Sequence, residues 1–377
     1  MPVKVLVVDD SVLYRRVLAD ALRSLPEVEV VGSVANGASA VPKVRELHPD
    51  LVTLDIEMPG MNGIEVMGAL RQAGLEVKVL IVSSVTVSGG QLTLQALRLG
   101  AFDFITKPSG SRAEENFRAI REELAPRLRA LAHRVEVQNL LRPATVAPER
   151  SAAVLRAAQR ADIPRRAPER AASTVATLPG VARKPEMVVI GVSTGGPNAL
   201  ATIFASLPGN LGVPVLVVQH MPPIFTQLLA ANLSANSALK VREAAHDEEM
   251  VANVAYVAPG GRHMGVAPGA GGSRRLRLSD DPPENSCRPA VDYLFRSVAH
   301  HFPGRALAVI LTGMGDDGAL GLRLLKRGGC TVIAQDEASS VVFGMPKAAI
   351  EAGVVDVVLP LEAIADRIAT LARGPQL

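Results

Sequence analysis

Short runs of apolar residues alternate with amphipathic stretches along two long parts of this chain, and this alternation restricts the possible folds more than any other feature. The runs are rich in Val, Ile and Leu and are bounded by turn residues, which predicts buried strands. The stretches between them repeat apolar residues every three or four positions, which predicts helices. Buried strands that alternate with helices form a parallel sheet with helices on both faces. The chain is therefore expected to contain two α/β units.

The first unit is expected in residues 1–125. Its strands are predicted over Val3–Val8, Val28–Val34, Leu51–Leu54, Val77–Val82 and Phe102–Ile105. Helices are predicted after the first strand and over Ala40–Leu47, Gly63–Gln72 and Gln91–Leu99, with a last helix over Glu114–Leu131. Five strands alternating with helices in about 120 residues are typical of a doubly wound sheet of flavodoxin-like type.

The second unit is expected in residues 186–377, again as a doubly wound α/β sheet. Its strands are predicted over Met187–Gly191, Val213–Gln219, Val254–Ala258, Ala306–Thr312, Thr331–Ala334 and Val355–Leu359. Its helices are predicted over Pro197–Ser206, Phe225–Ser234, Ala290–His300, Gly318–Arg327 and Pro346–Ala352. The Gly-rich stretch 260–277, with its alternating RLRLS, predicts an appended hairpin.

The segment between the units, residues 126–185, differs from both in composition. It holds seven prolines among many Ala and Arg, and 12 basic against 4 acidic residues. This composition predicts a flexible linker, which either lets the two units dock and undock or acts only as a spacer. Without it, 28 basic and 33 acidic residues remain, so the sequence pI of about 9.0 is a property of the linker. We therefore expect no nucleic-acid partner.

The location of the protein is predicted from what the sequence lacks. No run approaches the ~18–20 apolar residues of a membrane span, and the first apolar run ends at Asp9 and Asp10, where a signal peptide would continue. We expect a cytoplasmic protein with no membrane insertion. The two cysteines, Cys287 and Cys330, are too few for a disulfide framework, so both are expected to be reduced and structural.

Polar residues follow the predicted strands of the first unit. Asp9 and Asp10 follow the first strand, Asp55 the third, Ser83 the fourth and Lys107 the fifth. The carboxyl ends of parallel strands share one edge, where three carboxylates would repel one another unless a hard cation such as Mg²⁺ were bound. The lysine supplies a counter-charge for an anion, and we infer a phosphoryl group. A carboxylate beside the metal can attack a phosphoryl donor and become an acyl phosphate.

The motifs VDDS at 8–11, DIEMPGMNG at 55–63, SS at 83–84 and FDFITKP at 102–108 resemble the receiver domain of bacterial response regulators. The resemblance covers essentially all of the first 120 or so residues. It implies that a histidine kinase is the phosphodonor. It also implies a role for each matched residue: Asp55 as the phospho-acceptor, Asp9 and Asp10 with Asp55 as the Mg²⁺ ligands, Ser83 as the switch hydroxyl, Phe104 as the switch aromatic and Lys107 as the contact to the phosphoryl group.

The second unit begins with a strand that runs into the turn GVSTGGP, which carries Ser193. By itself this turn fits a phosphate loop, a packing turn or a nucleophile site. His220 follows the next strand, and the pair Asp316 and Asp317 follows a later one. Serine, histidine and aspartate at neighbouring strand ends supply a nucleophile, a base and an acid that orients the base. His263 is a second candidate base with a substrate-side or structural role, and these spacings do not separate Asp316 from Asp317.

The motifs GVSTGGP, QHMPPIFT, YVAPGGRHM, RPAVDYLF, ILTGMGDDGA and AQDEASSVVFGMP resemble the catalytic domain of the CheB family of chemotaxis protein-glutamate methylesterases, over Glu186 to Leu371. The resemblance implies Ser193 as nucleophile, His220 as base, Asp317 as orienting acid and the Met314 N–H as an oxyanion donor. The family commonly has Asn where this chain has Asp316. The implied function is a phosphorylation-activated serine esterase that removes methyl groups from glutamate methyl esters on chemoreceptor helices and also deamidates receptor glutamines, with no cofactor in the catalytic domain.

Two other classes of function are weighed against this one. A receiver joined to a DNA-binding output domain would be a transcription regulator, but residues 186–377 are strand-rich and lack a basic recognition helix. A signalling adaptor or phosphate sink with a degenerate output domain would not need an intact triad, and all three triad positions are present here.

Overall fold

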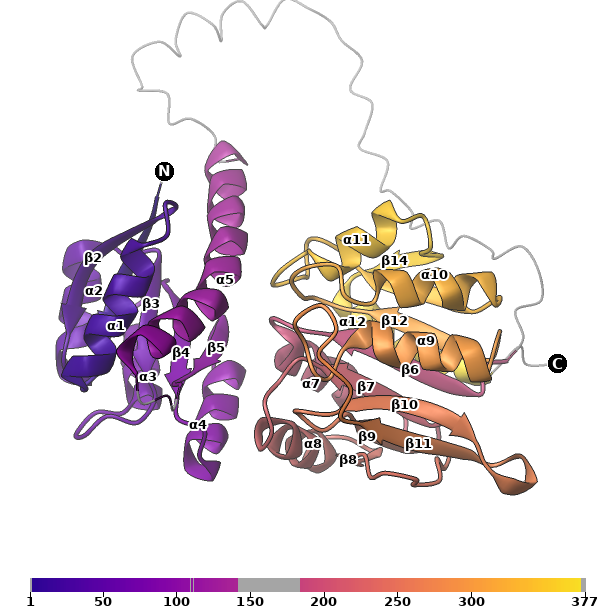
Figure 1. Cartoon of the computed structure of the whole chain (residues 1–377). Helices are drawn as coiled ribbons and strands as arrows, with labels where there is room; N and C mark the ends of the chain where they lie inside the picture. Colours follow the sequence, from indigo (N-terminus) through magenta and orange to yellow (C-terminus); the bar gives the residue numbers. More distant parts are fainter. Residues whose placement is uncertain (1, 109, 111, 142–183, 374–377) are drawn as a thin grey trace, which may run out of the picture.

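The computed structural model of the chain describes residues 2–108, 110, 112–141 and 184–373. It contains two α/β units that lie side by side, with α4 of the first facing α7 and α8 of the second (Figure 1). Residues 142–183, the larger part of the predicted linker, lie outside the described residues. Among the helices that are described, none is long and apolar enough to cross a membrane.

The first unit is a five-stranded parallel sheet in the order β2-β1-β3-β4-β5, which confirms the predicted flavodoxin-like topology. Leu6 and Val7, consecutive in the interior strand β1, are both fully buried and belong to different apolar clusters, because each face of the sheet is covered by helices. The strands are β1 (Val3–Val8), β2 (Val28–Val34), β3 (Leu51–Asp55), β4 (Lys78–Ser83) and β5 (Asp103–Thr106). The helices are α1 (Val12–Arg23), α2 (Gly37–Leu47), α3 (Gly63–Gln72), α4 (Val87–Arg98) and α5 (Ala113–Leu141).

Helix α5 is longer than the sequence predicted. We expected the unit to end at residue 125 and the helix at Leu131, but α5 continues to Leu141 and contains Pro126. A proline inside a helix costs about 3 kcal/mol. Leu124 and Leu128 on either side of it are fully buried, and burial of two such side chains offsets that cost at ~1.5–3 kcal/mol each. The predicted boundary at 125 is therefore too early for the helix.

The second unit is a seven-stranded parallel sheet in the order β14-β13-β12-β6-β7-β9-β8. Its direction of winding reverses between β6 and β12, and at such a switch point ligands bind beyond the carboxyl ends of the strands. The strands are β6 (Met187–Val192), β7 (Val215–Gln219), β8 (Lys240–Glu243), β9 (Val254–Val257), β12 (Ala306–Ile310), β13 (Thr331–Gln335) and β14 (Val357–Leu359). The helices are α7 (Gly196–Ser206), α8 (Phe225–Ala235), α9 (Val291–His301), α10 (Ala319–Arg327), α11 (Met345–Glu351) and α12 (Leu361–Arg373).

The predicted hairpin is confirmed. It consists of β10 (His263–Pro268) and β11 (Arg274–Ser279), paired antiparallel from His263 opposite Ser279 to Pro268 opposite Arg274. The sequence prediction missed β8 and α12. Strand β8 is an edge strand in which only Val241 is buried, so its sequence has none of the apolar run that revealed the other strands.

Candidate active site and phosphorylation site

Four charged residues meet at the carboxyl edge of the first sheet. Asp9 and Asp10 directly follow β1, Asp55 is the last residue of β3, and Lys107 directly follows β5. The Lys107 ammonium lies 2.7 Å from Asp55 Oδ2 and 3.0 Å from Asp9 Oδ2. One ligand oxygen from each of the three aspartates lies within 4.8 Å of the others. The structure thus brings together the carboxylates and the lysine that the sequence placed at separate strand ends.

Burial dominates the electrostatics of this cluster. It raises the pKa of Asp55 to about 6, against the opposing hydrogen bond and charge of Lys107. It also raises the pKa of Asp9. Asp9 Oδ2 is buried and accepts no hydrogen bond, although it faces the lysine charge. Three clustered carboxylates with an unused buried lone pair are a donor set that fits a hard divalent cation such as Mg²⁺.

The two predicted switch residues contact residues other than Asp55. The Ser83 hydroxyl is buried, accepts a hydrogen bond from Thr93 Oγ1 at 2.8 Å and lies 3.2 Å from the Ser84 carbonyl. Phe104 in β5 stacks on Phe225 at the start of α8, with ring centroids 4.7 Å apart and planes 22° apart. The side chain predicted as the receiver's switch aromatic is therefore part of the contact with the second unit.

Ser193 directly follows β6 at the switch point of the second sheet. Its N–H donates to the Thr312 carbonyl at 3.0 Å, and its carbonyl accepts from Gln219 Nε2 at 3.0 Å. The turn needs its glycines: Gly195 has φ of +78°, and a Cβ on Gly196 would lie 1.9 Å from Gln219 Oε1. The close approach of Gln219 to Gly196 holds the backbone of the turn just before α7. The Ser193 side chain in this turn is half-buried.

His220 and Asp317 form the polar pair beside that turn. His220 Nε2 lies 2.7 Å from Asp317 Oδ2, so Nδ1 is the ring nitrogen that this carboxylate does not engage. Within the described residues, no hydrogen bond joins the Ser193 hydroxyl to His220; such bonds are often long before substrate binds. Asp316 is exposed while Asp317 is 3% exposed, which separates the two aspartates that the sequence left open.

The pKa of His220 is set by two opposing effects. Burial lowers it, but hydrogen bonds to Asp317 and Cys287 outweigh burial and raise the pKa to about 9. The negative charge of Asp317 is in turn favoured, because the hydrogen bond and charge of His220 lower the pKa of Asp317 against its burial. Cys287 is a free, partly exposed thiol, as is the buried Cys330. Neither forms a disulfide with another described residue, and Cys287 is close enough to act on the pKa of His220, a position that its sequence context did not suggest.

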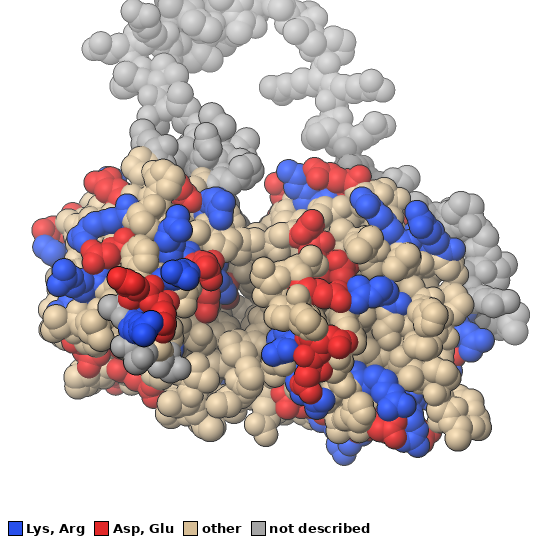
Figure 2. Space-filling model, viewed as in Figure 1, with Lys and Arg blue, Asp and Glu red and all other residues tan. Residues whose placement is uncertain are grey.

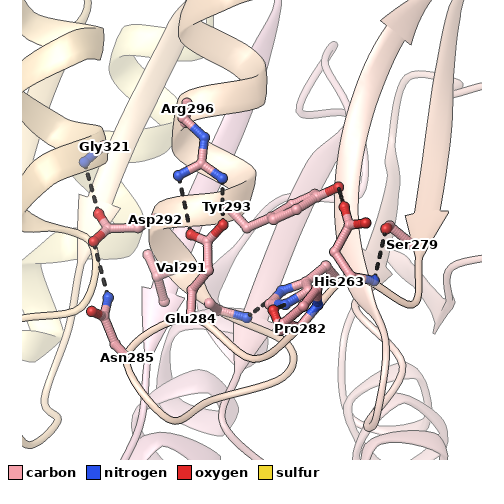
Figure 3. A network of polar contacts seen from close by, with 12 residues as sticks. His263, Ser279, Pro282, Glu284, Asn285, Val291, Asp292, Tyr293, Arg296 and Gly321 are labelled. Carbon is pink, nitrogen blue, oxygen red and sulfur yellow. Dashed lines mark hydrogen bonds and ion pairs between the residues drawn. The ribbon is translucent and has the colours of Figure 1, made fainter.

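His263, the second candidate base, is fully buried at the start of hairpin strand β10. Its Nδ1 accepts from the Ala290 N–H at 3.2 Å, and its Nε2 lies 3.0 Å from the Pro282 carbonyl. Its ring stacks on Tyr293 with centroids 4.4 Å apart (Figure 3). Both ring nitrogens are therefore engaged by the backbone, which favours the structural alternative for His263.

The first unit reaches the second beside Ser193. Asp103 Oδ2 in β5 accepts from Thr194 Oγ1 at 2.9 Å and from Arg127 Nε at 2.9 Å, and all three line one cavity with Ser193 and His220. Sequence reasoning missed Asp103, Thr194 and Arg127 as site residues. The motif around Ser193 contained Thr194, but its partner belongs to a separate unit, so no local pattern pointed to the contact.

Comparisons with known proteins agree with both units. The profile of the response regulator receiver domain matches residues 5–116, and that of the CheB methylesterase matches residues 188–368. The chain is 45% identical over 366 residues to a protein-glutamate methylesterase/protein-glutamine glutaminase from Desulfotalea psychrophila, covering 97% of each chain. A protein of the same name from Nocardioides is 43% identical, covering 95% of this chain and 92% of the other. The crystal structure of the Thermotoga maritima CheB methylesterase catalytic domain is 44% identical and covers 49% of this chain and 97% of that chain, with a TM-score of 0.48.

Proposed function

The chain belongs to the CheB methylesterase family, and we propose on that basis a division of labour in which residues 3–141 accept a phosphoryl group and residues 184–373 hydrolyse glutamate methyl esters. It is a carboxylic ester hydrolase, a protein-glutamate methylesterase and protein-glutamine glutaminase under phosphorylation control. The observation that carries the residue roles is the 2.7 Å contact between His220 and Asp317 at the strand ends beside Ser193.

Ser193 is the proposed nucleophile. His220 acts in its neutral form, which is the minor form at pH 7 because the pKa is raised to about 9. It takes the hydroxyl proton at Nδ1 while Asp317, hydrogen-bonded at Nε2, stabilises the imidazolium. The Ser193 oxygen adds to the ester carbonyl, and the tetrahedral intermediate expels methanol, which receives the proton from His220. Water then attacks the glutamyl ester of Ser193 with His220 again as base, which releases the glutamate side chain and restores the serine. A glutamine side chain follows the same steps with ammonia as the leaving group.

The negative oxygen of each intermediate needs donors. We propose the Met314 N–H in the turn after β12 as one of them, next to the N-terminus of α7. Gly313 supports this placement, because a Cβ there would lie 2.8 Å from the Ser193 Cβ, so the two turns are in close contact. A single oxyanion donor contributes about 3–4 kcal/mol in comparable hydrolases.

Asp55 is the proposed phospho-acceptor, with a histidine kinase as the donor. Asp9, Asp10 and Asp55 would hold Mg²⁺, which when bound neutralises charge on the transferred group. Lys107 supplies the protein's own positive charge at the same edge, 2.7 Å from Asp55. Ser83, now held by Thr93, would turn to the phosphoryl oxygens.

The receiver is proposed to restrain the esterase until Asp55 is phosphorylated. Two contacts support this: the Asp103 carboxylate holds Thr194, the residue after the nucleophile, and Phe104 stacks on Phe225. If phosphorylation draws Ser83 and Phe104 toward Asp55, the stack on Phe225 is lost and the docked arrangement weakens. Substrate would then reach Ser193.

The proposed substrate is a methylated helix of a chemoreceptor, and the proposed location is the cytoplasm. Basic and acidic side chains are interspersed over both units on the face in Figure 2, with no continuous basic stripe of the kind that nucleic-acid binding requires. We therefore retain the expectation of a protein substrate and no nucleic-acid partner.

The test is methanol release from methylated receptor membranes, with and without a small acyl phosphate as phosphodonor. The full chain should release methanol faster with the phosphodonor. Ser193→Ala and His220→Ala should abolish release, and Asp55→Asn should abolish only the stimulation. Activity retained by Ser193→Ala would remove Ser193 as the nucleophile.

A further inference from the structure

A four-residue turn, Glu284 to Cys287, lies over the His220–Asp317 pair. The N–H of Cys287 donates to the Glu284 carbonyl at 2.8 Å and the N–H of Glu284 to the Cys287 carbonyl at 3.1 Å. The two central residues, Asn285 and Ser286, have φ of +51° and +61°. Positive φ at both central positions is the signature of a type I′ turn, and Asn is favoured at the first of them. The turn is thus built with a residue that tolerates this backbone and also carries a polar side chain.

The side chain of Asn285 points to two buried carboxylates. Its Nδ2 donates to Asp317 Oδ1 at 2.9 Å and to Asp292 Oδ2 at 3.1 Å. Figure 3 shows the contact with Asp292, which also accepts from the Gly321 N–H at 2.7 Å. One amide therefore joins the carboxylate that orients the base to a second carboxylate at the start of α9.

The remaining donors to Asp317 come from elsewhere. Oδ2 accepts from the Val291 N–H at 2.7 Å and contacts His220, and Oδ1 also accepts from the Asp292 N–H at 2.9 Å. The Asp317 carboxylate is thus held by two backbone N–H groups, and the Asn285 amide is a further side-chain donor to it. Burial raises the pKa of Asp292, and the charge of Asp317 raises it further. Without a donor between them, two buried carboxylates this close repel each other.

The turn is also fixed at its outer end. Arg296 in α9 pairs with Glu284 through two contacts, at 3.0 Å and 2.5 Å (Figure 3). The first residue of the turn is therefore tied to α9 and its centre to Asp317. A side chain held this way costs little entropy to keep in place when substrate binds.

We propose that Asn285 is a positioning residue of the esterase reaction: its amide holds Asp317 in the orientation that meets His220, and it separates Asp317 from Asp292. This proposal deepens the proposed function and depends on it. Asn285 lies outside the triad motifs, and its role follows from the turn that places it.

The test compares two glycine substitutions in the same turn. Asn285→Gly keeps the left-handed backbone and removes the amide, whereas Ser286→Gly keeps both the backbone and the amide. In the phosphorylated full chain, kcat for methanol release should fall ~10–100-fold in Asn285→Gly, the range expected when a catalytic group is misplaced by about 1 Å. KM should stay within about twofold, because the Asn285 amide is engaged by Asp317 and Asp292 and the proposal gives it no role in binding substrate. Ser286→Gly should keep wild-type kcat.

The pH profile gives a readout that a purely structural role would not change. Asp317 faces His220 and Asp292, and His220 also faces Cys287. Removing the neutral donor leaves more uncompensated negative charge beside His220, so the acid limb of kcat/KM should move to higher pH in Asn285→Gly. Asn285→Asp, which also tolerates the turn, adds a carboxylate and should move it further.

The outcomes separate clearly. If Asn285→Gly melts like the wild type and keeps its kcat and acid limb, the positioning role is wrong. If both glycine variants lose the same activity, the turn backbone matters and not the amide, which also overturns the proposal. If the wild type releases no methanol, or Ser193→Ala releases as much, the proposed function itself has failed.

Discussion

Gly90 offers a way to separate the two units without changing either reaction site. It is buried in α4, and a Cβ placed on it would lie 2.6 Å from Leu228 Cδ1 in α8 of the other unit. The same Cβ would lie 3.8 Å from the Phe225 ring. Gly90→Leu would therefore push a whole side chain between the receiver and the esterase.

The expected magnitude follows from packing. Forcing extra carbons into a well-packed contact costs ~1–3 kcal/mol. Here the strain is relieved by undocking, because the two units are separate folds. With about 1.4 kcal/mol per factor of ten, the ratio of docked to undocked chains should fall roughly 5- to 150-fold. Gly90→Ala should have a much smaller effect, since the nearest atom is the end of a flexible leucine.

Gly68 provides a matched control. It lies in the middle of α3, and nothing lies within 4 Å of a Cβ placed on it. Gly68→Leu gains the same helix propensity, worth up to about 1 kcal/mol, without meeting another unit. The assay is methanol release without phosphodonor: Gly90→Leu should raise this basal rate and Gly68→Leu should not. An unchanged basal rate in a normally folded Gly90→Leu protein would refute the restraint by docking.

Two further predictions concern charge. Contacts that include Asp317 hold the folded-state pKa of His220 at about 9, above its ordinary 6.5. The pair should therefore stabilise the fold fully below pH 6.5 and lose this contribution as pH rises through about 9. The melting temperature should fall over that window in the wild type and much less in His220→Ala, and equal falls would contradict this prediction. Mg²⁺ at about 100 times its Kd should stabilise the chain by ~2.7 kcal/mol if only the folded state binds it. A thermal melt should show this as a higher melting temperature, and a chelator should reverse it. The Asp10→Ala variant, which lacks one exposed carboxylate of the cluster, should lose most of the shift, and an undiminished shift would place the metal elsewhere.

The sequence was most informative where a strand is buried on both faces. Val3–Val8 was predicted with its exact bounds, because a parallel strand between two helix layers is largely apolar. The edge strand Val28–Val34 was also predicted with its exact bounds, although none of its residues is buried, because it is rich in valine. Edge strand β8 has no apolar run, so the sequence did not reveal it. Pro126 suggested that helix α5 would end early, but the burial of the leucines on either side of it keeps the helix intact. Local pattern therefore detects strands that are rich in β-branched residues, and it fails for an edge strand such as β8 that has only one of them.

The residues of the candidate site also divide into those that the sequence could predict and those that it could not. Residues at strand ends, such as Ser193 and His220, were found because topology alone brings them to one edge. Spacing did not separate Asp317 from Asp316; the family resemblance selected Asp317, and its burial agrees with that choice. Asn285 could not be found, because its side chain reaches Asp317 through a turn whose backbone has positive φ at two residues other than glycine. That conformation is a property of the folded loop and not of a spacing.

Strand β5 explains how one short element can serve both sites in the proposed switch. Lys107, directly after it, contacts Asp55, and Asp103 at its start holds Thr194. Four residues along a strand span ~13 Å, so no long relay is needed. The docking contacts must also be weak enough to reverse. A hydrogen bond to a charged group contributes ~1.5–3 kcal/mol and an aromatic stack ~0.5–1.5 kcal/mol. Losing the Phe104 stack and weakening the Asp103 contact would together change the docking equilibrium by a few kcal/mol, which is enough to turn a mostly docked population into a mostly undocked one.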